Sequence, residues 1–392
     1  MKKDTKLATL GRRKEWTGGV VNPPVYRAST HLFDSYADLR TAVRQPDAGL
    51  FYGRRGGPTV WSLQEAMREL EGGAGCLVYP SGMAAVSTAV LAYVSPGDQV
   101  LAPDSVYETT RLFLDGFARR MGIQVTYYDP LIGGGIEQLL TPQSRVVLVE
   151  SPGSLTFEVQ DIPAIAEAAH ARDAVVIMDN TWATPLLFDA LAHGVDVSVQ
   201  ACTKYIVGHS DVMLGTATAN EAAWPRLKRV TRRLGQIASP DDVYLALRGL
   251  RTLSVRLDRH EKNGLDVARW LADRPEVGRL LHPAFDSCPG HALWQRDFSG
   301  ASGLFSIVLN RGSYDAMGAF VDDMKLFKLG FSWGGYESLI LPSDPSEIRT
   351  ATRWEAPGPL VRLHVGLEDP ADLIADLDAA FDRFNAAVGA AG

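Results

Sequence analysis

The chain has 392 residues, enough for a large hydrophobic core and for two domains. Its hydrophobic content of 46% and its mean hydropathy near zero are typical of a globular protein and exclude a disordered or membrane-embedded chain. The net charge of −7 offers no electrostatic footprint for nucleic acid or for an anionic membrane, so we expect neither as a partner.

Several features predict a cytoplasmic protein without a metal site. Cys76, Cys202 and Cys288 are scattered, which argues against a disulfide framework or a zinc site and fits a reducing compartment. The basic N-terminus has no apolar core of the signal-peptide type. The apolar run at 76–94 is interrupted near its start by Pro80, and is better interpreted as a strand, a turn and a helix than as a membrane span.

Residues 1–56 are rich in turn-forming residues and contain few long periodic runs. This pattern predicts an extended arm with short helices, of the kind that wraps a neighbouring domain or subunit. The run FYGRRGGPT at 51–59 follows, and its two arginines fit either an exposed loop or an anion-binding corner.

Strand-like and helical segments alternate from about residue 72 to 215, which predicts a mostly parallel, doubly wound sheet. Gly82 opens a helix in the turn Ser81-Gly82-Met83, where free N–H groups and the helix dipole favour an anion. Tyr107 opens another helix, and an aromatic residue in that position is by default a packing residue. The expected strands are 77–79, 99–102, 145–151 and 174–180, and the expected helices are 61–70, 162–171 and one near 186–193.

Two strand ends in this alternation carry candidate catalytic residues. The apolar strand 174–180 brings Asp179 to its C-terminal end, where ligands bind in parallel α/β sheets. The next strand, 196–200, leads to Lys204, which has apolar neighbours on both sides. A buried ammonium is costly unless it is paired or chemically committed, for example to an imine with a carbonyl cofactor. The alternatives are a lysine that extends to water and an aspartate that caps a turn.

After residue 215 the pattern predicts a smaller α+β region. Helices are expected at 224–233 and over a long linking segment at 243–270, and a closing amphipathic helix at 372–384. The segments 303–310 and 360–365 alternate in the manner of antiparallel strands.

The lysine segment DVSVQACTKYIVGHS and the aspartate segment AVVIMDNTWATP resemble signatures of the Cys/Met-metabolism family of pyridoxal-phosphate enzymes. The resemblance extends in order over nearly the whole chain. It implies fold type I, in which a mostly parallel, doubly wound sheet domain is joined to a smaller α+β C-terminal domain and an extended N-terminal arm. On that basis we expect the arm at 1–56, the cofactor-binding domain at 57–250 and the C-terminal domain at 251–392.

The resemblance also implies roles for individual residues. Lys204 would bind pyridoxal 5′-phosphate covalently, and Asp179 would keep the ring nitrogen protonated so that the ring acts as an electron sink. Tyr107 would stack on the ring, with its hydroxyl available for proton transfer. The groups expected to hold the cofactor phosphate are Gly82, Met83, Thr203 and, from a neighbouring subunit, Tyr52 and Arg54.

Four stretches, FYGRRG, ESPGS, DNTWA and SWGGYES, are most similar to the cystathionine β-lyase branch of the family. The γ-acting relatives typically carry asparagine in place of Ser154 and a leucine-like residue in place of Trp333. Arg362, within LVRLHVG, would clamp the substrate α-carboxylate, with Ser154, Ser332 and Trp333 completing the substrate site. Two departures weaken the transfer of roles: Ala201 replaces a phosphate-binding serine, and Phe331 replaces a tyrosine.

The reaction implied is β-elimination of L-cystathionine to homocysteine, pyruvate and ammonia, a step of methionine biosynthesis. A small amino-acid thioether is therefore the expected substrate, and a homotetramer built from dimers with shared active sites is the expected assembly. The alternatives are a cystathionine γ-lyase or γ-synthase, or a general cysteine-S-conjugate β-lyase. A cofactor-binding regulatory protein is disfavoured, because no DNA-binding or interaction module is appended.

Overall fold

The computed structural model describes residues 1–390, and it is organised around a seven-stranded sheet with the order β1-β7-β6-β5-β4-β2-β3. The pairs β2–β3, β2–β4, β4–β5 and β5–β6 are parallel, whereas β7 runs antiparallel to both β1 and β6. The predicted fold class, a mostly parallel sheet with helices on both faces, is confirmed. The strands are β1 (Gly75–Tyr79), β2 (Gln99–Pro103), β3 (Gln124–Tyr128), β4 (Ser144–Glu150), β5 (Val175–Asp179), β6 (Val197–Gln200) and β7 (Gly215–Ala219).

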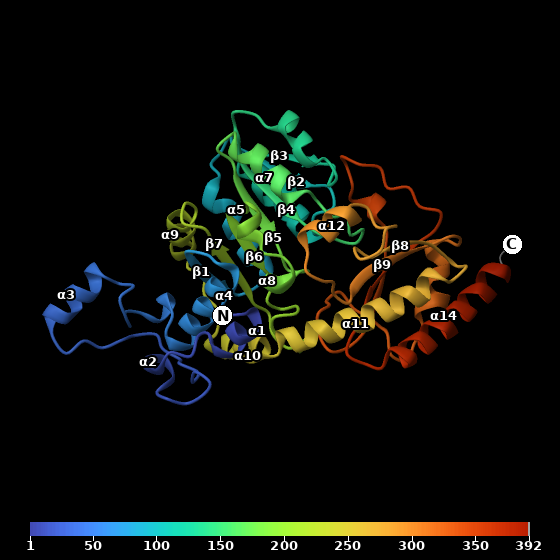
Figure 1. Ribbon diagram of the computed structural model, residues 1–392. Helices are drawn as coiled ribbons and strands as arrows, with labels where there is room; N and C mark the ends of the chain where they lie inside the picture. Colours follow the sequence, from blue (N-terminus) through green and yellow to red (C-terminus); the bar gives the residue numbers. More distant parts are fainter. Residues whose placement is uncertain (391–392) are drawn as a thin grey trace.

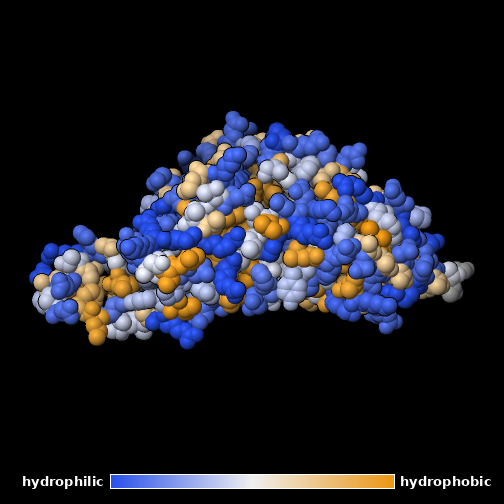
Figure 2. Space-filling model, turned by 60° about the horizontal axis from the view of Figure 1, so that its bottom comes forward, coloured by the Kyte–Doolittle hydropathy of each residue, from blue (hydrophilic) through white to orange (hydrophobic). Residues whose placement is uncertain are grey.

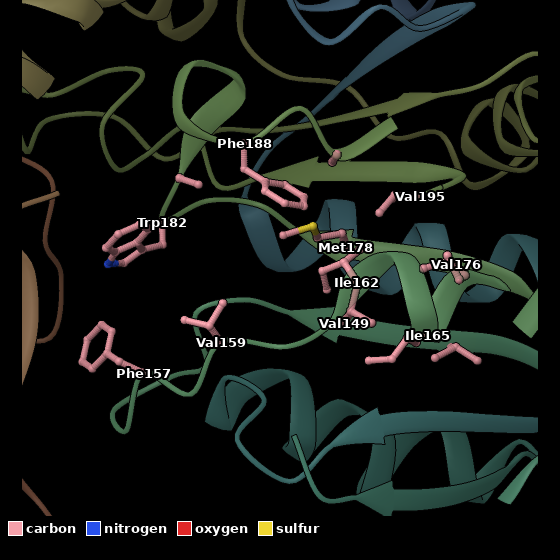
Figure 3. Packing of buried hydrophobic residues seen from close by; sticks show 14 of the residues in the cluster. Val149, Phe157, Val159, Ile162, Ile165, Val176, Met178, Trp182, Phe188 and Val195 are labelled. Atoms are coloured by element: carbon pink, nitrogen blue, oxygen red, sulfur yellow. The ribbon is translucent and has the colours of Figure 1, made fainter. Parts of the chain in front are cut away.

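Both faces of this sheet are buried, which explains why its strands are almost continuously apolar. In β4, Val146 and Leu148 pack on one face with α5 (Gly82–Tyr93), while Val147 and Val149 pack on the other with α7 (Ile162–His170). Figure 3 shows the cluster on the α7 side of the sheet, in which Val149 of β4 and Met178 of β5 lie close to Ile162 of α7. The remaining elements of this part are α4 (Pro58–Glu71), α6 (Glu108–Leu112), the π-helical turn η2 (Phe113–Ala118), η3 (Gly133–Leu139), α9 (Trp224–Leu234) and α10 (Pro240–Arg251).

The single helix expected near 186–193 is wrong. The segment forms α8 (Thr184–Leu187) and the short 3-10 helix η4 (Ala190–His193), with extended backbone at Phe188 between them. The Asn180 amide donates to the carbonyls of both Thr184 and Phe188, at 3.3 and 3.1 Å, and fixes this break. Because Phe188 is buried in the core, its aromatic ring stabilises the extended conformation that interrupts the helix.

The long linking helix expected at 243–270 is also divided. Helix α10 ends at Arg251, and α11 (Leu253–Ala272) begins after Thr252, whose backbone is not helical. The Arg256 guanidinium, near the start of α11, donates to the carbonyl of Gly249 at 2.8 Å and satisfies an end carbonyl of α10. In Figure 1, α11 runs from the central sheet to the C-terminal part of the molecule.

The C-terminal part contains a five-stranded sheet with the order β10-β11-β12-β9-β8. Its β9 residues Phe305 and Ile307 pack toward α11 and α14, whereas Leu304 and Val308 pack toward the central sheet. Figure 1 shows α11 and α14 side by side on the outer side of this sheet. The elements are β8 (Val277–Leu281), α12 (His291–Asp297), β9 (Leu304–Leu309), η5 (Tyr314–Ala316), α13 (Met317–Val321), β10 (Lys328–Leu329), β11 (Leu339–Ser343), η6 (Pro345–Glu347), β12 (Leu360–His364) and α14 (Pro370–Ala390).

The N-terminal region contains α1 (Lys3–Thr9), α2 (Lys14–Thr17), α3 (Tyr36–Arg44) and the 3-10 turn η1 (Gly53–Arg55). Helix α1 is docked through the buried Leu7, but α3 has no buried residue and projects from the body in Figure 1. Figure 2 shows hydrophobic side chains on the surface at this end of the molecule. In the N-terminal region, Leu32 is 92% exposed and Tyr36 is 73% exposed. The domain boundaries at 57 and 251 stay a prediction. Within residues 1–390 the helices are all too short or too polar to cross a membrane.

Candidate active site

A cavity of about 390 Å³ lies at the C-terminal edge of the parallel strands, between the central sheet and the C-terminal part. This is the edge at which α/β sheets bind ligands. Most of the predicted site residues line it together, although they come from segments far apart in the sequence. They are Gly82, Met83, Tyr107, Ser154, Asp179, Thr203, Lys204, Ser332, Trp333 and Arg362.

Lys204 follows β6 in a tight turn and extends its amine into the cavity. Its Nζ donates to the Ser332 hydroxyl at 2.9 Å and lies 5.4 Å from the centre of the Trp333 ring. Burial, and after it the positive charge of Arg362, lowers the pKa of Lys204 to about 8, against the opposing effect of Asp179. The amine is therefore buried and readily deprotonated, which suits a nucleophile or a base.

Asp179 ends β5, and its carboxylate accepts hydrogen bonds from the backbone N–H and the hydroxyl of Thr181. Burial raises the pKa of Asp179, while the Thr181 bonds and the charge of Lys204 oppose the rise. Thr181 also accepts the N–H of Ala201 at 2.8 Å, so it connects the aspartate to the lysine turn. This connecting role of Thr181 is not apparent from the sequence, although Thr181 lies within the aspartate segment AVVIMDNTWATP.

The N-terminus of α5 forms a polar corner of the cavity. Ser81 caps the helix by accepting the N–H of Ala84 at 3.1 Å, and the N–H groups of Gly82 and Met83 belong to the first turn, where they have no intrahelical partner. A Cβ on Gly82 would lie 2.5 Å from the Cβ of Ala201, so glycine allows the helix end to approach the lysine turn. The Thr203 hydroxyl, expected to bind phosphate, contacts the Leu214 carbonyl at 3.2 Å and accepts the Leu214 N–H at 2.9 Å.

Tyr107 stands at the mouth of the cavity as the residue before α6, with 47% of its surface exposed. Its backbone N–H donates to the Glu150 carboxyl at 2.8 Å. Glu150 is a cavity residue to which the sequence analysis gave no role, although it opens the quoted stretch ESPGS. Burial, and then the charge of Asp179, raises the pKa of Glu150 well above its usual range, against the effect of the Tyr107 N–H.

A buried carboxylate three residues before Tyr107 fastens the mouth of the cavity to the C-terminal part. Asp104 accepts the N–H groups of Thr350, Ala351 and Thr352 at 2.9, 3.0 and 2.7 Å, and pairs with Arg111 at 2.6 Å. Burial opposes ionisation, but these donors outweigh it and lower the pKa of Asp104. The Asp104 side chain therefore stays ionised and holds residues 350–352 against the strand end that leads to Tyr107.

The C-terminal wall of the cavity comes from β12 and from the loop 330–335. Arg362 on β12 donates through Nη2 to the carbonyls of Phe331, Ser332 and Gly330, at distances between 3.2 and 3.4 Å. Burial lowers the pKa of Arg362 to about 10, which still leaves the guanidinium charged at neutral pH. Phe331 is 87% exposed at the rim of the cavity, where a tyrosine was expected from the resemblance.

The structure of one chain does not bring Tyr52 and Arg54 into this cavity. Arg54 donates to the Arg232 carbonyl at 2.9 Å and lies on a separate surface cleft that also includes Asp47. Asp47 pairs there with Arg55 at 3.0 Å and with Lys228 at 2.7 Å. Among residues 1–390, no cluster of three or more histidine, cysteine or acidic side chains is arranged to bind a metal ion.

Comparisons with known proteins agree with this geometry. The model of the Cys/Met metabolism PLP-dependent enzyme family matches residues 4–382. A cystathionine β-lyase of Escherichia coli is 48% identical over 97% of this chain and 98% of its own, and one of Haemophilus influenzae is 47% identical over the same shares. A crystal structure of a cystathionine γ-synthase from Xanthomonas oryzae, in complex with aminoacrylate and cysteine, superposes with a TM-score of 0.89 at 31% identity, covering 99% of each chain. The chain belongs to the Cys/Met metabolism family of PLP-dependent enzymes.

Proposed function

We propose that this chain is a carbon–sulfur lyase that uses pyridoxal phosphate to convert L-cystathionine and water into homocysteine, pyruvate and ammonia. The observation that carries the proposal is the convergence of Lys204, Asp179 and Arg362 on one cavity. Together they provide an amine, a carboxylate that can keep a ring nitrogen protonated, and a cation for the substrate carboxylate. The similarity to proteins named cystathionine β-lyase supports β-cleavage as the reaction.

The residues of the cavity fit the cofactor. The first-turn N–H groups of Gly82 and Met83 provide donors for a phosphate at the positive end of the α5 dipole. Lys204 is available as the attachment point, and the buried Asp179 lies on the adjacent strand end to pair with the ring nitrogen. When bound, pyridoxal phosphate supplies an electron sink that stabilises negative charge on the substrate Cα.

The remaining steps belong to residues of the chain. Arg362 holds the substrate α-carboxylate, and this fixes the Cα–H bond relative to Lys204. The Lys204 amine, with its pKa lowered to about 8, removes the Cα proton. The bond from Cβ to sulfur then breaks, the sulfur receives a proton, and the three-carbon enamine reacts with one water to give pyruvate and ammonia. Tyr107 also lines the cavity, and its hydroxyl provides a second group for proton transfer besides the Lys204 amine.

The proposal includes an active site shared between subunits, within a homotetramer built from dimers. In support, Tyr52 and Arg54 lie outside their own chain's cavity, and the arm that precedes them exposes hydrophobic side chains such as Leu32. Each arm would supply Tyr52 and Arg54 to the phosphate end of a neighbouring cavity. The cytoplasm is the proposed location, in line with the buried free cysteines.

The alternative is γ-cleavage, because the solved structure of a γ-synthase matches the fold closely. Identification of the keto acid separates the two reactions. Purified protein incubated with L-cystathionine is expected to release pyruvate and homocysteine in equal amounts. Release of 2-oxobutanoate and cysteine would assign the chain to the γ-acting branch. Faster turnover of other cysteine S-conjugates would make it a general β-lyase, and bound cofactor without turnover would favour a regulatory protein.

A further inference from the structure

The loop 330–335 determines what surrounds the amine of Lys204. Ser332 accepts the hydrogen bond from Nζ, and the Trp333 ring lies 5.4 Å from it. Gly334 packs on the lysine backbone itself, since a Cβ there would lie 2.8 Å from the Lys204 carbonyl carbon. Its φ of +84° is also a conformation that favours glycine. Small movements of this loop would therefore change the contacts of the reactive amine directly.

Strand β12 holds the loop from two points. Arg362 and His364 are two residues apart, so both side chains lie on the face of β12 that is directed to the cavity and the loop. Arg362 contacts loop carbonyls, whereas the fully buried His364 accepts the N–H of Gly334 at 3.0 Å through Nε2. Arg362 is the proposed carboxylate clamp, whereas His364 has no part in binding or catalysis as proposed so far.

The hydrogen bond requires one form of the His364 ring. Nε2 lies between the Gly334 N–H at 3.0 Å and the Gly335 carbonyl at 3.1 Å, whereas Nδ1 is buried without a partner among the described residues. Nε2 accepts the Gly334 N–H in the neutral form that carries its proton on Nδ1. His364 faces the charges of Lys204 and Arg362, the ring of His260 with its centre 5.2 Å away, and the Gly335 carbonyl 3.1 Å from Nε2. Burial, and then the neighbouring His260 ring, lowers the pKa of His364 well below its usual range. Arg362 and Lys204 add to this lowering, and the Gly335 carbonyl opposes it. The ring therefore stays neutral, so one of its two nitrogens is always an acceptor.

We infer that His364 is a positioning residue for the lyase reaction: by accepting the Gly334 amide it holds Ser332 and Trp333 against the Lys204 amine. It touches neither substrate nor cofactor in this role and acts through the loop. The inference rests on the proposed function for its kinetic test and on the structure alone for its spectroscopic test.

Glutamine and asparagine at position 364 make a matched pair, because both are neutral and polar. A glutamine amide reaches the place of Nε2 and can accept the Gly334 N–H, whereas an asparagine amide reaches the place of Nδ1 and cannot. His364→Asn is expected to lose about tenfold or more in kcat/KM, since an unpaired buried amide is costly. His364→Gln is expected to recover most of this loss. Equal kinetics for the two variants would overturn the inference.

His282 provides the control for a merely structural effect. It is fully buried in the C-terminal part and accepts the Ala284 N–H at 3.1 Å, but it does not line the cavity. His282→Leu removes a buried acceptor of the same kind, and it is expected to lower the melting temperature while kcat/KM stays within about twofold. If this variant lost as much activity as His364→Asn, the effect would be one of general stability and the inference would be wrong.

A double-mutant cycle tests the route through the loop. If His364 acts through Ser332, the loss from His364→Asn should largely disappear in a Ser332→Ala background, whereas independent effects would multiply. A second readout uses the holoenzyme without substrate: the pH midpoint of the cofactor absorbance should shift in His364→Asn and not in His282→Leu. This readout remains valid even if the wild-type protein releases no pyruvate, an outcome that would refute the proposed function. Multiplicative losses or an unchanged midpoint would overturn the role of His364.

Discussion

Glu150 and Asp179 are paired residues on the adjacent parallel strands β4 and β5, and their two carboxyl groups share the floor of the cavity. Two like charges so close together and shielded from water disfavour double ionisation, which raises the pKa of one or both groups. Asp179 is next to the cationic Lys204 and bonded to Thr181, whereas Glu150 has the Tyr107 N–H as its hydrogen-bond donor. We therefore assign the negative charge to Asp179 and the proton to Glu150.

This assignment predicts opposite results for two substitutions of Glu150. Glu150→Gln replaces a neutral carboxyl by a neutral amide that can still accept the Tyr107 N–H, so activity should stay within about threefold of wild type. Glu150→Leu removes the acceptor, and the displaced Tyr107 should lower kcat/KM by about tenfold or more. Steady-state kinetics of both purified variants provide the check. A large loss in Glu150→Gln would mean that the glutamate is charged.

The second prediction concerns the pH dependence of cofactor attachment to protein from which the cofactor has been removed. The nucleophile is the neutral amine, and the pKa of Lys204 is lowered to about 8 from 10.5. The rate of attachment should therefore rise with pH up to about pH 8 and then level off. For an ordinary lysine, the rate would continue to rise up to about pH 10.5. Arg362→Met removes a charge that disfavours the ammonium, so the midpoint should move upward. Rapid mixing with pyridoxal phosphate at a series of pH values measures the attachment rate and its midpoint. Peptide mapping after borohydride reduction should place the adduct on Lys204.

Asp179→Ala should separate cofactor binding from cofactor activation. The phosphate contacts and Lys204 remain, so some cofactor should still bind and show its visible absorbance. Turnover should nevertheless fall by several powers of ten, because an unprotonated ring is a poor electron sink. Cofactor content and kcat, measured on the same preparation, give the two quantities. Retained turnover with a full complement of cofactor would contradict the role of Asp179.

Arg362→Ala removes the proposed carboxylate clamp. Truncation of a buried charge partner costs roughly 2–5 kcal/mol, so kcat/KM should fall by about 10² or more. Cofactor content should be unchanged, and Arg362→Lys should recover only part of the loss, since an ammonium cannot form a bidentate pair. Near-normal kinetics for the alanine variant would remove Arg362 from the substrate site.

A shared active site can be tested by mixing two inactive subunits, Lys204→Ala and Arg54→Ala. If Arg54 acts across the interface, one site of each hybrid pair has both residues and activity returns. If Arg54 acts within its own chain, every site lacks one residue, and mixing recovers nothing. Subunit exchange must be demonstrated separately, for example by a mass tag on one variant.

The sequence was sufficient to place Asp179 and Lys204 together at one edge of the sheet. Asp179 ends one apolar strand and Lys204 follows the next. The C-terminal ends of parallel strands lie at the same edge of the sheet, and this does not depend on the conformation of the loops. Thr181, Glu150 and His364 could not be assigned, because each acts through a hydrogen bond to a backbone amide: Ala201, Tyr107 and Gly334 respectively. No residue type or spacing in the chain marks these pairs. The helices were misjudged where a side chain less than ten residues away in the sequence bonds the backbone at the break, as Asn180 and Arg256 do.

The contact of Asp104 with residues 350–352 has a mechanical consequence. Three consecutive backbone amides and Arg111 converge on one buried carboxylate, so this corner of the cavity behaves as a fixed pivot. A change in the orientation of the C-terminal part relative to the central sheet would therefore turn about this contact, three residues from Tyr107.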